Sequence, residues 1–320
     1  MNLSEHQIAE IVSRYKSGDT TRQLATLYSR THQTINHHLK KQGVILRSRS
    51  EARRKHRLNE SAFDSINEEG AYWIGFLMAD GNVYEVKKGS PRIKLELARC
   101  DLAHIERFKR FLGASHPIHF YKSERRKPFS DNASLAVSSV KLAESLARYG
   151  VTPRKSFTAR VIGLEYNRDF WRGMIDGDGY IAANGRKRFE LIGSKASMEQ
   201  FATFVEVNTN GFKPEVKPYL NIFKVELWGK NAVQTLNVLY KDCTIALPRK
   251  LERAKGVIEV LELGGRVKRK RRSKGLSLEQ AALEINMSIA TLSRIENSVG
   301  MPDAKNVARI TAWLGASVIS

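Results

Sequence analysis

The hydrophobic positions between residues 67 and 262 change period in an order that occurs twice. Each copy has a helical pattern, two stretches of alternating apolar and polar residues, and a helical pattern with two phenylalanines. Two more alternating stretches and a closing helix complete each copy. Corresponding ranges are 92–98 and 186–192, then 116–121 with 134–138 and 215–219 with 221–227, and finally 140–149 and 231–240. The pattern predicts an α+β fold in which the order αββαββα is duplicated.

Ahead of this centre, residues 4–43 show three short helical patterns. Ser4 can cap the first helix, Gly18 can end it, and Thr31 can cap the third. The segment resembles a resolvase-type helix-turn-helix, with Ser29 where the turn usually has glycine. A helical packing module without DNA contact is the alternative, and a zinc site would lack nearby Cys or acidic ligands. The third helix offers these outward side chains for base edges in a major groove: His32, Gln33, Asn36, His37 and Lys40.

Residues 275–320 show a second pattern of this kind. Ser277 can cap a helix that ends at Asn286, a residue type that tolerates the left-handed conformation of a tight turn. Residues 276–282 and 288–297 resemble the Cro/C1-type helix-turn-helix of phage repressors. That resemblance implies base contacts from Ile289, Ala290 and Arg294, and contacts with the DNA backbone from Ser288 and Thr291.

Composition adds a strong positive charge to this picture. The 320-residue chain has 54 Lys and Arg against 33 Asp and Glu, a formal net charge of +21, which predicts a polyanionic partner, nucleic acid first. Basic runs at 47–57 and 266–274 are interpreted as linkers lying along phosphates, with a merely solvated tether as the alternative. The predicted organisation is a module at 1–46, a basic linker at 47–66, halves at 67–163 and 164–262, a basic linker at 263–274, and a module at 275–320.

Several classes of protein are excluded on the same grounds. Cys100 and Cys243 are too few for a disulfide framework and too distant in sequence for a metal knuckle. The first residues lack the apolar core of a signal peptide. No uncharged apolar run approaches the roughly 18 residues that a membrane span needs. We therefore expect a cytoplasmic, DNA-associated protein.

The clearest repeat in the centre is a nine-residue motif. Residues 73–81, WIGFLMADG, align with residues 171–179, WRGMIDGDG, 98 positions later. Small residues four apart on one helical face allow two helix backbones to approach closely. The predicted helix interface is therefore formed by Gly75 and Ala79 with Gly173 and Gly177.

Pairing of the motif helices brings Asp80 and Asp178 together at their C-terminal ends. Two carboxylates there repel each other, oppose the helix macrodipole and are partly buried. A divalent cation offsets these costs, because Mg²⁺ or Mn²⁺ binds carboxylate oxygens, water and phosphate. The alternative is two unrelated, solvent-facing aspartates. The repeat thus predicts a metal site that includes both residues.

On these residues, the centre resembles a single-chain LAGLIDADG homing endonuclease with two motifs. The resemblance implies two pseudo-twofold halves, each presenting a saddle-shaped sheet to the major groove of double-stranded DNA. It implies metal binding by Asp80 and Asp178, with the backbone carbonyls of Ala79 and Gly177 as adjoining ligands. Met78 departs from the family pattern, which often has an acid there.

The resemblance also implies one basic residue from each half near the scissile phosphates. The tripeptide Pro-Arg-Lys occurs at 153–155 and again at 248–250, so Lys155 and Lys250 match that place. Such a protein would act as a monomer on a long, asymmetric target. Strand residues expected to contact the groove are Arg92, Lys94, Arg186, Arg188, Lys217 and Lys224.

Two functions from different classes follow. The first is a site-specific DNA endonuclease, bacterial or phage-encoded, in which metals at Asp80 and Asp178 serve attack and departure while Lys155 and Lys250 stabilise charge. The second is a transcription regulator that binds DNA on the same scaffold without cutting it. An intron maturase that binds RNA is a third, weaker alternative.

Overall fold

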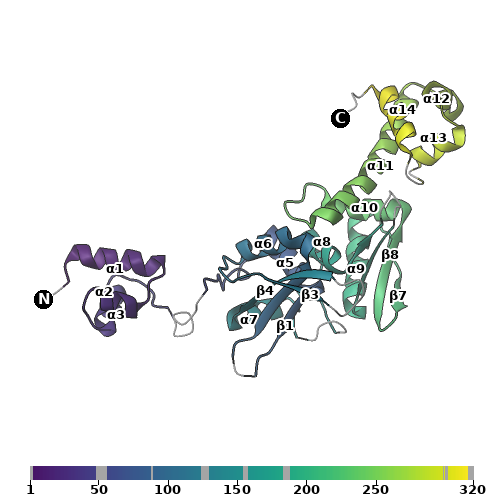
Figure 1. Ribbon diagram of the computed structural model, residues 1–320. Coiled ribbons are helices and arrows are strands. Elements are labelled where there is room, and N and C mark those ends of the chain that lie inside the picture. Colours follow the sequence, from purple (N-terminus) through teal and green to yellow (C-terminus); the bar gives the residue numbers. More distant parts are fainter. Residues whose placement is uncertain are drawn as a thin grey trace. The chain divides into compact units, whose positions relative to one another are not determined.

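The computed structural model describes residues 3–47, 56–87, 89–123, 130–153, 158–182, 188–297, 299 and 302–315. The chain divides into two compact units, Met1–Arg57 and Leu58–Ser320. The first unit is a small helical module, and the second holds the α+β domain and the C-terminal helices (Figure 1). Across the described ranges, no helix is both long and apolar enough to cross a membrane.

Within its described residues, the first unit contains the helices α1 (Glu5–Ser17), α2 (Thr21–Leu27) and α3 (His32–Lys41). Ser4 caps α1 and Thr31 caps α3, each accepting a hydrogen bond from a backbone amide of the first turn. The turn before α3 holds Ser29 in the left-handed region, at φ 52°. The buried side chains that join the helices are Ile11, Tyr15, Leu24, Ala25, Ile35 and Leu39.

Arg47 belongs to this first unit, although the sequence predicted it to begin a linker along phosphates. Its guanidinium stacks 4.3 Å from the ring centroid of Tyr15 and donates to the carbonyl oxygens of Tyr15, Gly18 and Asp19. These carbonyls lie at and just beyond the C-terminus of α1, where a cation is favourable. The next part of this basic run, residues 48–55, lies outside the described residues.

The α+β domain consists of two halves with the same order of elements. The first half contains α5 (Glu68–Ala79), β1 (Gly81–Tyr84), β2 (Arg92–Ala98), α6 (Leu102–Phe111), β3 (His119–Ser123), β4 (Ser130–Ser138) and α7 (Val140–Ala147), with a short 3₁₀ turn, η1 (Arg99–Asp101), before α6. The second contains α8 (Arg168–Asp178), β5 (Tyr180–Ile181), β6 (Arg188–Gly193), α9 (Lys195–Asn208), β7 (Val216–Tyr219), β8 (Ile222–Trp228) and α10 (Gly229–Tyr240). This order confirms the predicted α+β class and its duplicated αββαββα arrangement.

Each half has one four-stranded antiparallel sheet, and the two sheets share one topology. Their strand orders are β1-β2-β4-β3 and β5-β6-β8-β7. Alternation decides which face is buried: on β2, Ile93, Leu95 and Leu97 point to the core, and on β6, Phe189 and Leu191 do. Arg92, Lys94 and Glu96 therefore share the opposite face of β2.

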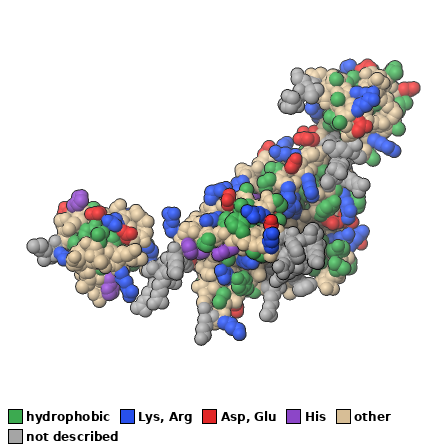
Figure 2. Space-filling view, in the orientation of Figure 1, with side chains coloured by type: hydrophobic (Ala, Val, Ile, Leu, Met, Phe, Trp, Pro, Cys, Tyr) green, Lys and Arg blue, Asp and Glu red, His purple; other side chains and the backbone are tan. Residues whose placement is uncertain are grey.

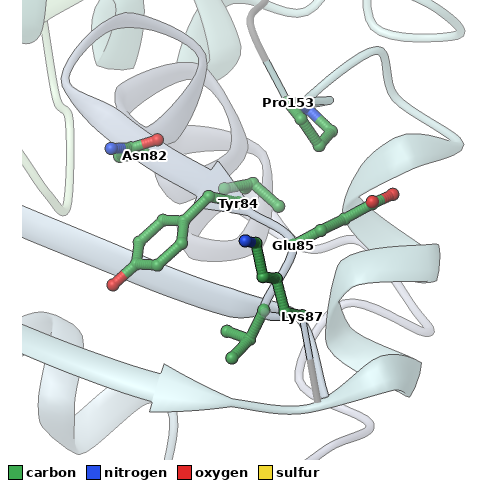
Figure 3. Close-up of a pocket in the computed structure, with 7 residues that line it drawn as sticks. Asn82, Tyr84, Glu85, Lys87 and Pro153 are labelled. Carbon is green, nitrogen blue, oxygen red and sulfur yellow. The ribbon is translucent and has the colours of Figure 1, made fainter. Parts of the chain in front are cut away.

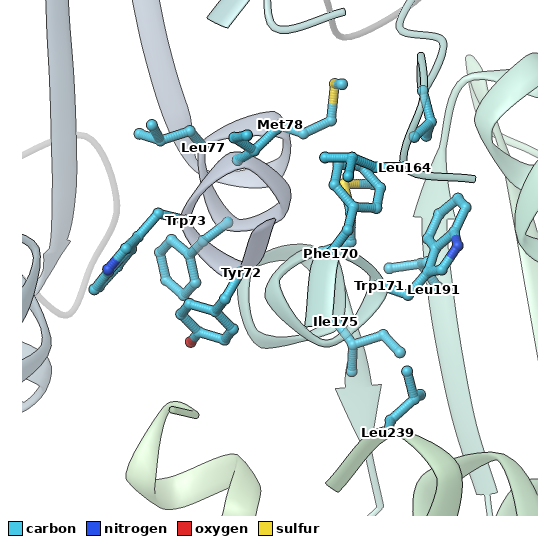
Figure 4. Packing of buried hydrophobic residues seen from close by; sticks show 14 of the residues in the cluster. Tyr72, Trp73, Leu77, Met78, Leu164, Phe170, Trp171, Ile175, Leu191 and Leu239 are labelled. Carbon is cyan, nitrogen blue, oxygen red and sulfur yellow. The ribbon is translucent and has the colours of Figure 1, made fainter. Parts of the chain in front are cut away.

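The core of the domain is built around α5 and α8, which lie side by side (Figure 4). Trp73 and Trp171 occupy equivalent motif positions, and both are fully buried. The ring of Trp73 lies 4.8 Å from that of Phe108 on α6, and the ring of Trp171 lies 5.0 Å from that of Phe201 on α9. In each half, this aromatic pair packs one helix, α6 or α9, against the motif helix of that half.

Each predicted linker is folded at the end that adjoins the α+β domain. Residues 58–66 pack on the domain core, with Phe63 buried at 1% exposure. Residues 263–273 are helical and form the second half of α11 (Pro248–Ser273). The reason is visible at Leu263 and Val267, which lie one turn apart and pack into the C-terminal module.

The C-terminal module combines the end of α11 with α12 (Leu278–Ile285), α13 (Ile289–Glu296) and α14 (Ala304–Leu314). Asn286 ends α12 in the left-handed conformation at φ 58°, as the sequence predicted. The Arg271 guanidinium forms a largely buried ion pair with Glu296, at 2.6 Å. α11 is therefore an integral helix of this module.

Candidate active site at the paired helices

The backbones of α5 and α8 approach each other closely at their small residues. A Cβ placed on Gly75 would lie 1.9 Å from the carbonyl oxygen of Phe170, and one on Gly173 would lie 2.1 Å from that of Tyr72. A Cβ on Gly177 would meet the Cβ of Ala79 at 2.4 Å. The structure thus brings the four small residues together, and any side chain at the glycines would push the helices apart.

The same approach brings the C-terminal ends of the two motif helices together. Asp80 is the residue that ends α5, and Asp178 is the last residue of α8. The Cγ of Asp80 lies 3.5 Å from the position of a Cβ on Gly177, so its carboxyl group is adjacent to the last turn of α8. A cavity of about 170 Å³ beside these ends is lined by Met78, Ala79, Met174, Asp178 and residues of the second half.

Lys250 lies in the first turn of α11 and is only 3% exposed. Its Nζ donates to the carbonyl oxygens of Ile175, Gly177 and Gly179, at 2.6, 3.0 and 2.7 Å. An ammonium group has three N–H donors, so all three are directed at the end of α8. In the structure the charge of Lys250 compensates the negative end of α8. Its place near a scissile phosphate stays a prediction.

The surroundings of Lys250 act on its pKa in opposite directions. The pKa of Lys250 is lowered to about 8, mainly by burial: Asp176 opposes this shift, Arg249 adds to it, and Asp80 and Asp178 also favour the charged form. Lys250 thus interacts electrostatically with both motif aspartates.

A buried polar network that the sequence did not predict is centred on Asp176 of α8. Asp176 accepts hydrogen bonds from the Tyr72 hydroxyl, the Tyr240 hydroxyl and the Leu247 amide, at 2.7, 2.7 and 2.6 Å. Burial raises the pKa of Asp176, and these three hydrogen bonds act against that shift. The Tyr72 oxygen also lies 2.8 Å from Nε2 of His104. Because Tyr72 donates its proton to Asp176, His104 must donate from Nε2.

Arg172 extends this network along α8. Its Nε donates to the carbonyl oxygen of Ile245 and its Nη1 to that of Leu239, at 2.7 and 2.9 Å, and it forms an ion pair with Asp169 at 2.6 Å. The signal in the sequence was a basic and an acidic residue four apart, Arg172 and Asp176, within an otherwise apolar motif helix.

In the first half, the repeated tripeptide is described only at Pro153. Pro153 lines a cleft of about 790 Å³ (Figure 3). The rest of its lining comes from β1 and the turn after it, residues 82–87. Lys155, the predicted counterpart of Lys250, lies outside the described residues.

The residues at the helix ends match the ligand preference of a hard divalent cation. Asp80, Asp178 and the carbonyls of Ala79 and Gly177 offer only oxygen atoms, as Mg²⁺ prefers. The Gly177 carbonyl accepts from Lys250 but has a second lone pair. Among the described residues, no group of three or more His, Cys, Asp or Glu could hold a metal. Water and phosphate oxygens would therefore have to complete the coordination.

The outward face of the first sheet carries two of the predicted groove-contacting residues. Arg92 is exposed at the start of β2. Lys94 forms a 2.5 Å ion pair with Glu96 and lies 5.5 Å from the ring centroid of Tyr121. Lys94 is thus held among neighbours on its own sheet.

The outward face of the second sheet is an ion-pair network flanked by aromatic rings. Glu190 and Glu226 face each other across β6 and β8, and Arg188 bonds both, at 2.9 and 2.6 Å. Lys224 lies 4.0 and 3.7 Å from the same two carboxylates. Lys217 pairs with Glu215 at 3.2 Å. Arg186 lies outside the described residues.

The outward helical residues lie where the sequence predicted them. On α3, His32, Gln33 and Lys40 are exposed, and Asn36 is half-buried. On α13, Ser288 caps the helix and its hydroxyl lies 2.8 Å from that of Thr291. Ile289 and Ala290 are exposed in the first turn of this helix, and Arg294 is exposed in its last turn.

Comparison with known proteins gives one family match. A family model described as helix-turn-helix matches residues 267–318. The match begins inside α11, at the buried Val267, and identifies the C-terminal module as a helix-turn-helix. No curated protein in the comparison matches the sequence.

Several solved structures are similar to this chain. The homing endonuclease I-WcaI bound to its DNA recognition sequence is 15% identical, with 66% of this chain and 97% of that chain covered, at a TM-score of 0.45. I-DmoI in complex with DNA and Ca is 18% identical, with coverages of 62% and 98% and a TM-score of 0.42. Full-length WhiA from Thermatoga maritima is 15% identical, with coverages of 79% and 95% and a TM-score of 0.40.

Proposed function

We propose that this chain is a site-specific DNA endonuclease. Asp80 and Asp178 would form the reaction centre in which it hydrolyses phosphodiester bonds. The observation that carries the proposal is the glycine-mediated contact of two helix C-termini, which puts the Asp80 carboxyl against the turn that ends in Asp178. Like charges at two negative helix ends destabilise a fold. A divalent cation bound by the two carboxylates would offset this destabilisation and would bind the phosphate of a DNA substrate.

The protein's own groups would have distinct parts in the reaction. Asp80, Asp178 and the carbonyls of Ala79 and Gly177 would hold Mg²⁺ or Mn²⁺, which when bound supplies Lewis acidity and a more acidic water. Lys250 would hold the Gly177 carbonyl in place and add positive charge near the phosphate. Lys155 would have the corresponding place in the first half.

Double-stranded DNA is the proposed partner, and a monomer on a long, asymmetric target is the proposed assembly. The net charge of +21 supports a polyanion. Lys and Arg side chains are distributed over the helical modules and the α+β domain on the face that Figure 2 shows. The two outer modules are unlike each other in sequence, so their contacts on DNA would differ.

A randomised-site library tests the proposal. The full-length protein, incubated with the library in Mg²⁺, should yield a set of members cut in both strands, and EDTA should abolish the cut. Selected sites should be cut again when cloned individually. Absence of any cut member in Mg²⁺ or Mn²⁺, with DNA binding intact, would contradict the nuclease.

A DNA-binding regulator without cleavage is the second candidate. It is favoured by the helix-turn-helix match at residues 267–318 and by α11, which joins that module to the domain in one helix. The same library, read by retention instead of cleavage, distinguishes the two: a regulator enriches sites that stay uncut in every divalent cation.

A further inference from the structure

Arg172 and Asp176 form a polar stripe on only one of the two motif helices. Both side chains are fully buried, and the residues 98 positions earlier, on α5, are Ile74 and Met78. A buried charged residue is costly unless it is hydrogen-bonded. These two side chains are hydrogen-bonded, and the partners show what the stripe holds.

The partners of the stripe cluster in the segment that leads into α11. Arg172 donates to the carbonyls of Leu239 and Ile245, and Asp176 accepts from the amide of Leu247. Leu247 is the residue before α11, and its own side chain gives no cap. Asp176 thus supplies the negative group that a helix N-terminus favours.

This anchor is linked to the candidate active site through Lys250. Lys250 follows Leu247 by three residues, in the first turn of α11, and bonds the carbonyls of Ile175, Gly177 and Gly179. The connections therefore form a closed circuit: Asp176 holds the start of α11, α11 carries Lys250, and Lys250 holds the turn of α8 that contains Gly177 and Asp178.

The first half is held differently. Met78 stands in place of Asp176, and its Cε lies 3.3 Å from the position of a Cβ on Gly150, so the contact there is apolar. The stripe touches the first half through the Tyr72 hydroxyl, but its contacts with the start of α11 belong to the second half alone.

We propose that Asp176 is a positioning residue for the reaction centre of the second half, acting through the Leu247 amide on Lys250 and the Gly177 carbonyl. This inference rests on the proposed nuclease function. If it holds, loss of the anchor slows cleavage of one DNA strand and not of both.

The test is strand-resolved cleavage of a selected site by Asp176→Asn. The amide keeps the shape of the side chain but cannot accept all three hydrogen bonds. Cleavage of one strand should slow roughly ten- to a hundredfold, the other strand should change by less than about threefold, and nicked DNA should accumulate. The slowed strand should be the one that Lys250→Ala slows most.

Two further variants separate positioning from general destabilisation. Tyr240→Phe removes one donor to the same carboxylate and should give the same strand bias at a smaller factor, even if Asp176→Asn fails to fold. Leu135→Ala lowers stability in the first sheet, away from the stripe, and should show no strand bias. Equal slowing of both strands by Asp176→Asn or Tyr240→Phe would overturn the proposal.

Hydrogen exchange gives a readout that does not require cleavage. Oδ2 of Asp176 accepts from both Tyr72 and Leu247, so an amide oxygen at that position could keep the Leu247 bond, and the variant for this measurement is Asp176→Leu, which has no acceptor. In Asp176→Leu, the Leu247 amide and the first turn of α11 should lose at least about tenfold protection, while the amides of β2 and β4 should not change. Unchanged protection at Leu247 in Asp176→Leu would overturn the anchor. If the wild-type protein cuts no DNA, the proposed function fails, and this experiment still decides whether Asp176 holds α11.

Discussion

Three basic side chains, Arg47, Arg172 and Lys250, direct their positive charge at backbone carbonyls of the protein itself. Each contacts the carbonyls of a helix end or of the segment next to one. A sequence shows the charge of a residue but not its partner, so Arg47 was predicted to lie along phosphates and the carbonyl partners of Lys250 were not predicted. The net charge of +21 therefore overstates the charge available to DNA.

His104 gives the structure a specific pH dependence. Burial lowers its pKa to about 3, and in the unfolded chain it titrates near its ordinary 6.5. A depressed folded-state pKa means that protons bind the unfolded chain first, so the stability is full above pH 6.5 and falls as the pH decreases toward 3. The expected loss is about 1.4 kcal/mol per pH unit in this window.

The measurement is the free energy of unfolding by denaturant at pH 7, 6, 5 and 4.5, for wild type and His104→Gln. Wild type should lose about 2 kcal/mol more than the variant between pH 7 and 5. His119→Gln, at an exposed strand position, is the matched control and should follow wild type. Parallel pH curves for His104→Gln and wild type would show that His104 titrates normally.

The small and acidic motif residues could be predicted because the repeat itself carries the information. Two copies of Gly-x-x-x-small ending in Asp-Gly require two helices in close contact, and the structure has them. The partners of Asp176 could not be predicted, because Tyr240 and Leu247 lie 64 and 71 residues away along the chain. No local pattern connects positions so far apart.

Helix α11 is the element that sequence patterns described least well. The run of basic residues from 266 to 274 was predicted to be a linker that lies along phosphates. Leu263 and Val267 instead form a helical face that completes the C-terminal module, and Arg271 pairs with Glu296. Tertiary packing thus outweighs repulsion along the helix.

Val267→Ala tests whether this part of α11 belongs to the module. Val267 is fully buried, so the substitution should lower the stability of the C-terminal helices by about 1–3 kcal/mol. Hydrogen exchange in α12 and α13 should accelerate accordingly, while the α+β domain keeps its protection. Lys268→Ala, one position along, is the control. Equal protection of α12 and α13 in the two variants would show that residues 263–274 are a linker and not part of the module.

For the whole chain, the two outer modules extend the proposed interface beyond the α+β domain. Removal of residues 265–320 deletes the matched helix-turn-helix but leaves Val257 and Ile258 of α11 on the domain core. The truncated protein should neutralise fewer phosphates, so its DNA binding should be weaker. The log–log slope of affinity against salt should flatten by about 0.9 for each phosphate that the module neutralises. The footprint should shorten at one end, because the two modules differ.

The measurement is binding to a selected site at several salt concentrations, with a footprint at each. The cleavage position should stay the same in the truncated protein, because Asp80 and Asp178 remain. A truncated protein with wild-type affinity, salt slope and footprint would show that the C-terminal module binds something other than this DNA.

We propose that Asp80 and Asp178 together form the reaction centre at the ends of α5 and α8. Strand-resolved cleavage of a selected site in Mg²⁺ by Asp80→Asn and Asp178→Asn, with binding measured in parallel, decides whether both carboxylates are needed. We expect each variant to lose double-strand cleavage or to be reduced to nicking, while affinity is kept or raised because a negative charge near phosphate is removed. Double-strand cleavage at the wild-type rate by either variant would show that the substituted carboxylate is not part of the reaction centre.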